Sequence, residues 1–485
     1  MGYIEGTNRA QGMMFPMTVD EYIDETNEVR AIGAFLEALD FKGMKFNRAE
    51  PAETGRPGYD PRKMMGLYLW GHMNRLRSSR KLERECVRNL EAIWLMEGLR
   101  PDFKTISEFR RENGEGIKQV VVKFRLWAME AKLFGGELVA VDGSKFKAVN
   151  STQRNYTKKK LAKLIAKERA LIEKYLKQMD EADKEEEQSS GKEKVNADAL
   201  RKKLEGIKGY LEKHEKLARE MEKSGEGQIS QTDEESRLMT TQHGMDVCYN
   251  VQTAVDDKHK LIGAYEVTND CNDKEQLAEM AKKAKEALGV EELTVVVDGG
   301  YYEGNNIKEC EEAGIKVYMP VPESTAGKGR GLFPLDRFEY KDDRKVYVCP
   351  QGEELSKHRT EKAHNKEYDI YLTKACAQCP LKAQCTKSKT GRKIRRWVHH
   401  EVINRLIERS RLNPEMMKKR KSLVEHPFGT IKRVMDAGYF LLKGKKKVGI
   451  EVGLTVLAYN MKRVINIMGV GPMIDSMNKA AAWAG

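Results

Sequence analysis

Two apolar stretches of this chain end in the same way, with an aspartate followed by a glycine. Residues 137–141 lead into Asp142-Gly143, and residues 293–297 lead into Asp298-Gly299. A short run of apolar and β-branched residues that stops at a turn residue predicts a buried strand. In open α/β sheets, functional groups collect at the C-terminal ends of strands. The repeated ending therefore predicts an α/β fold in which two carboxylates share one edge of a sheet.

The residues that follow support such a sheet. Further strands are expected at 247–255, 261–267 and 316–321, and helices at 273–288 and 305–313. Together with the two stretches above, the order is three strands, helix, strand, helix, strand. This order is typical of a mixed sheet flanked by helices.

The first 135 residues are expected to form short helices with basic connections. Thr18 with Glu21 and Thr105 with Glu108 have the spacing of a capping box, so we expect a helix to begin at each pair. Such a region is either a helix-turn-helix reader of DNA or a plain helical bundle with a solvated basic face. The pattern favours neither.

Residues 156–224 are dominated by Lys, Glu, Leu and Ala, with apolar residues at helical spacing. We expect two antiparallel helices joined by a polar break at 188–191, which together form a projecting hairpin. A charge run of this kind is more often a solvated face than a binding surface, so no chemistry is assigned to it. Residues 322–400 are expected to be loops that carry cysteines, and helices close the chain over 401–467.

The charge balance favours a polyanionic partner. Lys and Arg exceed Asp and Glu, 87 to 74, which gives a net charge of +13. Nucleic acid or an acidic membrane suits this excess, although many basic proteins are merely soluble. No stretch reads as a membrane span, and the N-terminus lacks the pattern of a secretion signal. The eight cysteines are unevenly spaced, which suits a reducing cytosol, so we expect a cytoplasmic protein.

Paired carboxylates at strand ends have a specific chemical use. The hard oxygen ligands of Asp142 and Asp298 suit Mg²⁺, which keeps positions open for water and phosphate oxygens. Two metal ions about 3.5–4 Å apart activate an attacking hydroxyl and stabilise a leaving 3′ oxygen. The alternative is that one or both aspartates merely cap the turn at the following glycine.

A third acid, Glu425, lies on an expected helix. Glu425 and Lys432 are seven residues apart, so they share one helix face two turns apart. Arg420, Lys421 and Arg433 surround the acid and would hold phosphates beside it. Taken alone, a Glu near a Lys on a helix is usually a surface pair.

In combination these residues resemble the DDE transposases of bacterial insertion sequences, and the resemblance covers nearly the whole chain. Each motif is weak alone, but their order and number make a chance match improbable. The motifs are Tyr59-Asp60-Pro61, Arg77-Ser78-Ser79-Arg80, Val141-Asp142-Gly143-Ser144-Lys145, Ser236-Arg237-Leu238-Met239, Tyr249-Asn250-Val251-Gln252-Thr253-Ala254-Val255-Asp256, Asp298-Gly299-Gly300-Tyr301 and Val424-Glu425-His426-Pro427-Phe428-Gly429.

The resemblance implies an RNase H-like fold that cleaves transposon ends with Mg²⁺ or Mn²⁺ and joins the freed 3′ hydroxyl to target DNA. Asp142, Asp298 and Glu425 would be the metal ligands, and Lys432 the cation after the acid. Family members often carry Tyr and Arg upstream of the Glu, where this chain has Lys418 and Lys421. The expected partners are double-stranded DNA, as terminal inverted repeats and target, and a second copy of the chain. The expected DNA-contacting residues are Lys418, Lys421, Lys432, Arg433, Arg77, Arg80, Arg395 and Arg396.

These features divide the chain into five expected parts. Residues 1–135 would be a helical DNA-binding domain. Residues 136–150 and 237–321 would form the catalytic core, interrupted by a helical-hairpin insert at 151–236. A cysteine-rich insert at 322–400 and C-terminal helices at 401–485, which carry Glu425, would complete the catalytic domain.

Four cysteines are clustered late in the chain. Cys349, Cys376, Cys379 and Cys385 have the spacing C-x26-C-x2-C-x5-C. Four thiolates can bind Zn²⁺ tetrahedrally and stabilise a loop-rich element. An iron–sulfur cluster uses the same ligands, and the third possibility is that the four cysteines bind nothing.

Three functions remain open from the sequence. An active transposase would cut and join specific DNA ends in the cytoplasm, at the nucleoid. An inactive, domesticated descendant would only bind DNA. A nuclease of the same fold would hydrolyse DNA without joining it, because the same acidic triad activates water equally well.

Overall fold

The computed structural model describes residues 17–50, 57–186, 194–320, 331–363 and 366–479. A six-stranded sheet lies at the centre, with the order β4-β5-β1-β7-β8, and β6 pairs with β5 beside β4. β1 is antiparallel to β5 and parallel to β7, and β7 is parallel to β8. The strands are β1 (Leu138–Lys147), β4 (Arg237–Thr241), β5 (Gly244–Asp256), β6 (Ile262–Thr268), β7 (Leu293–Val296) and β8 (Ile315–Tyr318).

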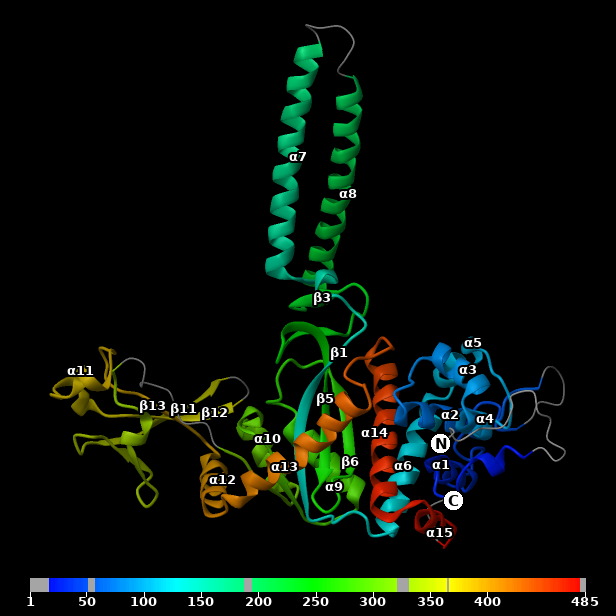
Figure 1. Cartoon of the computed structure of the whole chain (residues 1–485). Coiled ribbons are helices and arrows are strands. Elements are labelled where there is room, and N and C mark those ends of the chain that lie inside the picture. Colours follow the sequence, from blue (N-terminus) through cyan, green and yellow to red (C-terminus); the bar gives the residue numbers. More distant parts are fainter. Residues whose placement is uncertain (1–16, 51–56, 187–193, 321–330, 364–365, 480–485) are drawn as a thin grey trace, which may run out of the picture.

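Helices cover both faces of this sheet (Figure 1). On one face, Val139 and Val141 of β1 join a core with α9 (Leu277–Leu288), α10 (Gly304–Glu312) and α12 (His400–Leu412). On the other face, Leu138 and Ala140 pack against α13 (Glu415–Gly429). Side chains of a strand point alternately to its two faces, which explains this division. The mixed α/β prediction is confirmed.

The N-terminal helices share their core with the last helices of the chain. One hydrophobic cluster contains residues of the N-terminal helices, such as Val29 and Trp127, together with Leu457 of α14 (Lys445–Met468). It also includes Tyr249 of β5. The helices concerned are α1 (Glu28–Glu37), α2 (Pro61–Met73), α3 (Ser79–Arg88), α4 (Leu90–Leu95), α5 (Phe103–Glu112), α6 (Gly114–Glu130), α14 and α15 (Val470–Lys479).

The two predicted capping boxes do not begin helices where expected. Thr18 and Glu21 do exchange hydrogen bonds, but they enclose only the 3-10 turn η1 (Asp20–Tyr22). The first long helix starts later, at a cap formed by Asn27. At the second site Asp102 is the cap, accepting from the Lys104 and Thr105 amides, so α5 begins three residues earlier than Thr105 suggests. In both places an Asn or Asp, and not the predicted Thr, supplies the side-chain acceptor that caps the helix.

A long helical pair, α7 (Lys158–Glu186) and α8 (Lys194–Ser224), projects from the sheet (Figure 1). The short strands β2 (Asn155–Thr157) and β3 (Gln228–Ser230) pair at its base. Leu161, Leu217 and Met221 form a small core there. The polar break expected at 188–191 lies outside the described residues.

Residues 322–400 contain a second sheet, which the prediction of loops missed. β9 (Glu339–Lys341), β10 (Val346–Val348), β11 (Glu354–Ala363), β12 (Lys366–Leu372) and β13 (Ile394–Trp397) form an antiparallel sheet in the order β13-β12-β11-β10-β9. β11 is exposed along most of its length. It therefore lacks the apolar alternation by which a strand is recognised in sequence. The short helix α11 (Lys382–Cys385) lies between β12 and β13.

None of the described helices is long and apolar enough to cross a membrane.

Candidate active site

The structure brings Asp142 and Asp298 together. In the parallel pair β1–β7, Ala140 lies opposite Val296, and each aspartate follows two residues later. Because side chains alternate along a strand, both carboxylates point to the face that α13 covers. One prediction was wrong in detail: β1 does not end at Asp142 but continues to Lys147, because β5 pairs with it over that whole length.

Arg420 of α13 lies between the two aspartates. Its Nη2 is 3.6 Å from Asp142 Oδ1 and 3.4 Å from Asp298 Oδ2. The Asp142 and Arg420 side chains are about four-fifths buried, at 21% and 19% exposure, whereas Asp298 is 44% exposed. A single cation therefore faces two carboxylates that would otherwise repel each other.

The two carboxylates lie in different electrostatic settings. Burial raises the pKa of Asp142 to about 6; Arg420 opposes this shift and Asp298 reinforces it. Asp142 Oδ1 also accepts a hydrogen bond of 3.0 Å from the Gly143 amide. Asp298 Oδ1 accepts 2.8 Å from the Gly300 amide and caps the turn η3 (Gly299–Tyr301), while its Oδ2 faces Arg420. Turn capping and cation contact are thus combined in one side chain.

Glu425 is not part of this cluster in the structure. Its side chain is 65% exposed, and the nearest cation is Lys421 at 4.0 Å. Glu425 follows Arg420 by five residues, which rotates it by about 140° around the helix. The next residue, His426, bonds to Tyr459 of α14 at 3.0 Å, which holds this rotation of α13. Among the described residues, no three His, Cys, Asp or Glu side chains are arranged to hold a metal ion.

Lys432 points into the protein and contacts β1 close to Asp142. Its Nζ donates to Ser144 Oγ at 2.6 Å and to the Lys145 carbonyl at 2.8 Å. Burial lowers the pKa of this amine. Lys432 lies in the π-helical turn η7 (Thr430–Val434), which continues α13 after the internal Pro427. A proline removes one helical hydrogen bond, and π-turns often occur at functional sites.

A polar network lies directly behind Asp142, on the opposite face of β1. Asp273 Oδ1 accepts hydrogen bonds of 2.7 Å from both Asn250 and Gln252, and 3.3 Å from Lys145. A Cβ at Gly143 would come within 2.7 Å of this oxygen, so only glycine lets the strand approach so closely. Sequence reasoning assigned no role to Asp273, Asn250 or Gln252. The available signal was two amides inside an otherwise apolar strand.

The expected DNA-contacting residues fall into two groups. Arg77, Arg396 and Lys432 are engaged inside the protein: Arg77 pairs with Glu451 at 3.2 Å, and Arg396 lies 3.8 Å from the Tyr340 ring centre. The exposed residues are Arg80, Arg395, Lys418, Lys421 and Arg433. Of these, Arg395 contacts Glu361 at 3.3 Å.

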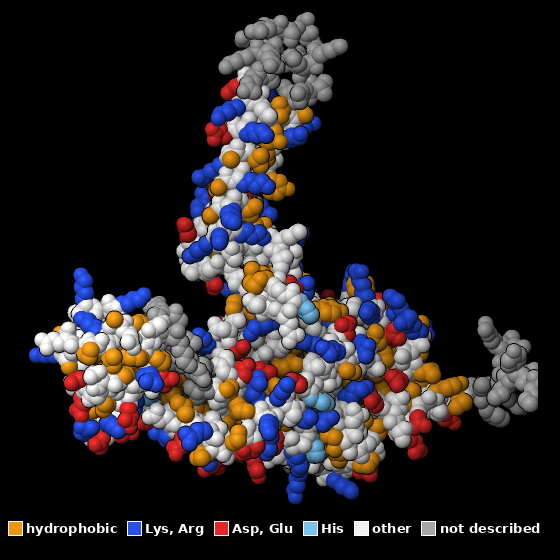
Figure 2. Space-filling model, turned by 60° about the vertical axis from the view of Figure 1, so that its left-hand side comes forward, with side chains coloured by type: hydrophobic (Ala, Val, Ile, Leu, Met, Phe, Trp, Pro, Cys, Tyr) orange, Lys and Arg blue, Asp and Glu red, His pale blue; other side chains and the backbone are white. Residues whose placement is uncertain are grey.

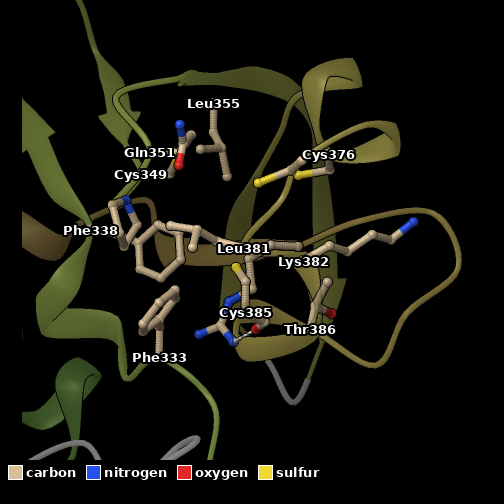
Figure 3. A pocket seen from close by; sticks show the side chains of 13 residues that line it. Phe333, Phe338, Cys349, Gln351, Leu355, Cys376, Leu381, Lys382, Cys385 and Thr386 are labelled. Carbon is tan, nitrogen blue, oxygen red and sulfur yellow. Dashed lines mark hydrogen bonds between the residues drawn. The ribbon is translucent and has the colours of Figure 1, made fainter.

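The four late cysteines line one pocket (Figure 3). All four are free thiols, and none of their groupings meets the arrangement of a metal site in the described part of the chain. Burial raises the pKa of Cys385, and the neighbouring thiols add to this shift. Gly391 has a φ of +99°, and a Cβ there would meet Cys376 Sγ at 3.1 Å. The backbone at Gly391 therefore packs closely against Cys376.

Two protein-family models match the chain. The model described as a transposase DDE domain matches residues 348–465, which include Glu425 and Lys432. The model described as a transposase domain (DUF772) matches residues 17–112. No curated protein matches the chain. The two matches confirm the resemblance to DDE transposases, a family that binds DNA and uses a divalent metal ion.

Proposed function

Because both ends of this chain match transposase domains, we propose that it is a DNA transposase that cleaves transposon ends and joins them to target DNA. The observation that carries the proposal is the pair Asp142 and Asp298, in register on parallel strands and facing one cation. The strand order, with β5 and β6 on one side of β1 and β7 and β8 on the other, supports an RNase H-like fold for this core.

The residues present fit a divalent metal ion in part. Asp142 and Asp298 offer hard oxygen ligands, and the space between them already holds a positive charge. The Nε of Arg420 is buried without a hydrogen-bond partner among the described residues, so the guanidinium is incompletely satisfied there. Mg²⁺ bound here would polarise a phosphate oxygen and acidify a bound hydroxyl. Asp142 and Asp298 would hold it, and we propose Glu425 as the third ligand on the evidence of the family motif.

The side chains around the pair have separate tasks in this proposal. Lys432 holds β1 in place through hydrogen bonds to Ser144 and the Lys145 carbonyl, and so fixes the position of Asp142 on that strand. The Asp273 network supports the same strand from behind. The exposed cations Lys418 and Lys421 are near enough to Glu425 along α13 to contact the phosphates that flank the cleaved bond. Two DNA ends must be brought together, so the proposed working form is a homodimer on DNA.

The proposal predicts metal-dependent cleavage and joining of DNA. Wild-type protein is incubated with the flanking element ends and a target plasmid, with and without Mg²⁺, and the products are separated by electrophoresis. Joined products are expected only with Mg²⁺. Nicks without joined products would select the nuclease instead, and bound but uncut DNA would select the inactive binding protein.

The same assay tests Glu425. Glu425→Gln is expected to lower the cleavage rate about a hundredfold, because one charge at a metal site is lost. Glu415→Gln removes an exposed acid from the same helix and serves as the matched control, with an unchanged rate expected. Equal rates for both variants would remove Glu425 from the site.

The cysteine pocket predicts a separate, structural zinc ion. Four thiols with the right chemistry for Zn²⁺ line one cavity. Cys376 lies in the turn η6 (Lys374–Ala377), Cys385 lies in α11, and Cys379 lies between them. Purified protein is expected to contain about one zinc per chain. Cys376→Ser should lose it, whereas Cys271→Ser, an exposed thiol outside the cluster, should keep it. Metal analysis that finds iron in place of zinc, or no metal in the wild type, would contradict the assignment.

A further inference from the structure

The outward side of α7 carries a row of lysines. Lys159, Lys163, Lys167, Lys174 and Lys177 are all exposed in the structure. At about 100° per residue, all five lie within an arc of about 80° on the side opposite Leu161, which packs toward α8. We call these five residues the lysine row. They follow one another along a single line of the projecting helix.

Four of the five members of the lysine row have no acidic partner among the described residues. Over residues 158–180, the arc that contains it holds no Asp or Glu, and the other residue in it is Ala170. Glu173 lies about 40° outside the arc. It pairs with Lys177, a member of the row, at 3.2 Å. Within the described residues, no acidic side chain lies within 4.0 Å of the amines of Lys159, Lys163, Lys167 or Lys174.

The second helix of the hairpin is different. On the exposed side of α8, basic residues alternate with Glu205, Glu212 and Glu220. The two helices carry similar numbers of charges: nine Lys or Arg and seven Asp or Glu in α7, and nine and six in α8. They differ in arrangement, because the lysines of residues 158–180 gather in one arc. The uniform positive charge is thus confined to one face of one helix. A generally soluble, charged hairpin does not require this asymmetry.

The shape of the row suits a nucleic acid duplex. From Lys159 to Lys177 the helix rises by about 27 Å. That length corresponds to about eight base-pair steps at ~3.4 Å each. The hairpin stands clear of the protein body, so a duplex has access to its side (Figure 1). Figure 2 shows Lys and Arg side chains along the hairpin stem.

A membrane surface does not suit the row. A helix that binds in the plane of a membrane needs an apolar face beside its basic face. The apolar face of α7 is turned toward α8, where Leu161 packs with Leu217 and Met221. The lysine arc itself contains no large apolar or aromatic residue that could insert into lipid or stack on a base.

We propose that the lysine row is a second DNA-contacting surface, which binds the phosphate backbone of duplex DNA without reading its sequence. This proposal rests on the proposed transposase function and assigns a role to a hairpin that the sequence alone left as a solvated face. Lysines that neutralise phosphates release counterions, so the contact should depend strongly on salt.

The test compares two variants with the same change in net charge. In one, Lys159, Lys163, Lys167 and Lys174 are replaced by Gln. In the control, Lys202, Lys213, Lys216 and Lys223, all exposed on α8, are replaced by Gln. The affinity for a duplex of about 60 base pairs and arbitrary sequence is measured at salt concentrations from about 50 to about 200 mM. Circular dichroism confirms that both variants keep their helices.

The row variant is expected to lose about tenfold or more in affinity, and its log–log salt slope should become shallower by about 3–4. The α8 control should change both quantities far less. Equal changes in the two variants would overturn the proposal, because bulk charge would then explain the binding. Loss of binding to an acidic polypeptide, with DNA affinity unchanged, would likewise overturn it in favour of a protein partner.

DNA binding by the lysine row can be tested separately from DNA cleavage and joining. Asp142→Asn removes the chemistry and leaves the lysine row intact, so it should bind the duplex as the wild type does. If the wild type cuts and joins DNA but the row variant binds normally, only the lysine row is refuted. If the wild type neither binds nor cuts DNA, both proposals fall.

Discussion

Asp142→Asn is expected to lower the rate of DNA cleavage about a thousandfold while leaving the fold intact. Asparagine has the same shape and keeps an oxygen for the Gly143 amide. It lacks the negative charge that faces Arg420 and that a divalent cation requires. The measurement is single-turnover cleavage of an element end in Mg²⁺, together with the thermal unfolding temperature of the variant.

The matched control for this substitution is Asp246→Asn. Asp246 lies on β5 of the same sheet and pairs with Lys147 at 3.0 Å, so its replacement removes one charge of the same kind. Its cleavage rate should stay within about twofold of the wild type, as surface substitutions usually have small effects. A rate for Asp142→Asn close to that of Asp246→Asn would contradict the assignment of Asp142 as a metal ligand.

The second large effect is expected on stability, at Arg77. This arginine follows α2 and reaches across to the C-terminal helices. Its guanidinium donates to the carbonyls of Asp436 and Tyr439 and to Glu451 of α14, with both charged side chains at most 4% exposed. Arg77→Met leaves Glu451 buried without its cation, which costs about 3–5 kcal/mol.

Amide hydrogen exchange measures this loss of stability in α14, the helix that carries Glu451. Amide protection in α14 should fall by about a hundredfold or more in Arg77→Met, since 1.4 kcal/mol corresponds to about a factor of ten. Arg80→Met, which replaces an exposed arginine that stacks on Phe103, is the control and should leave α14 protected. The double variant Arg77→Met/Glu451→Leu should recover part of the loss, because neither charge is then left alone. Unchanged protection in Arg77→Met would show that the pair contributes nothing.

The sequence predicts the aspartate pair well because the signal is local. Each carboxylate follows an apolar run, and adjacent parallel strands then bring Asp142 and Asp298 to the same level. Arg420 is different. It was grouped with the cations around Glu425, but it faces the aspartates. Which side of α13 meets the sheet depends on Leu423 and Val424 packing on β1 and on His426 bonding to Tyr459. The first of these contacts joins residues nearly 300 positions apart, the second joins two different helices, and no local pattern reports either.

The same distinction explains the other errors. Arg77 carries the charge of a DNA-contacting residue, and its sequence neighbours do not show that Glu451 lies within 3.2 Å. The sheet β9–β13 was missed because its central strand β11 is mostly exposed and polar. The strand β7, which leads to Asp298, was predicted correctly because it contributes apolar side chains to the cores on both faces of the sheet.

The shared core of α1–α6 and α14 has a consequence for how the chain is made. The ribosome delivers α6, which ends at Glu130, long before α14, which begins at Lys445. At about 5–20 residues per second, the intervening stretch takes about 15–60 s to synthesise. During this interval the surfaces of α2 and α6 that pack on α14 are uncovered, and Arg77 lacks its partner Glu451. Translation speed and chaperone access in that interval therefore bear directly on how much of this protein reaches its folded state.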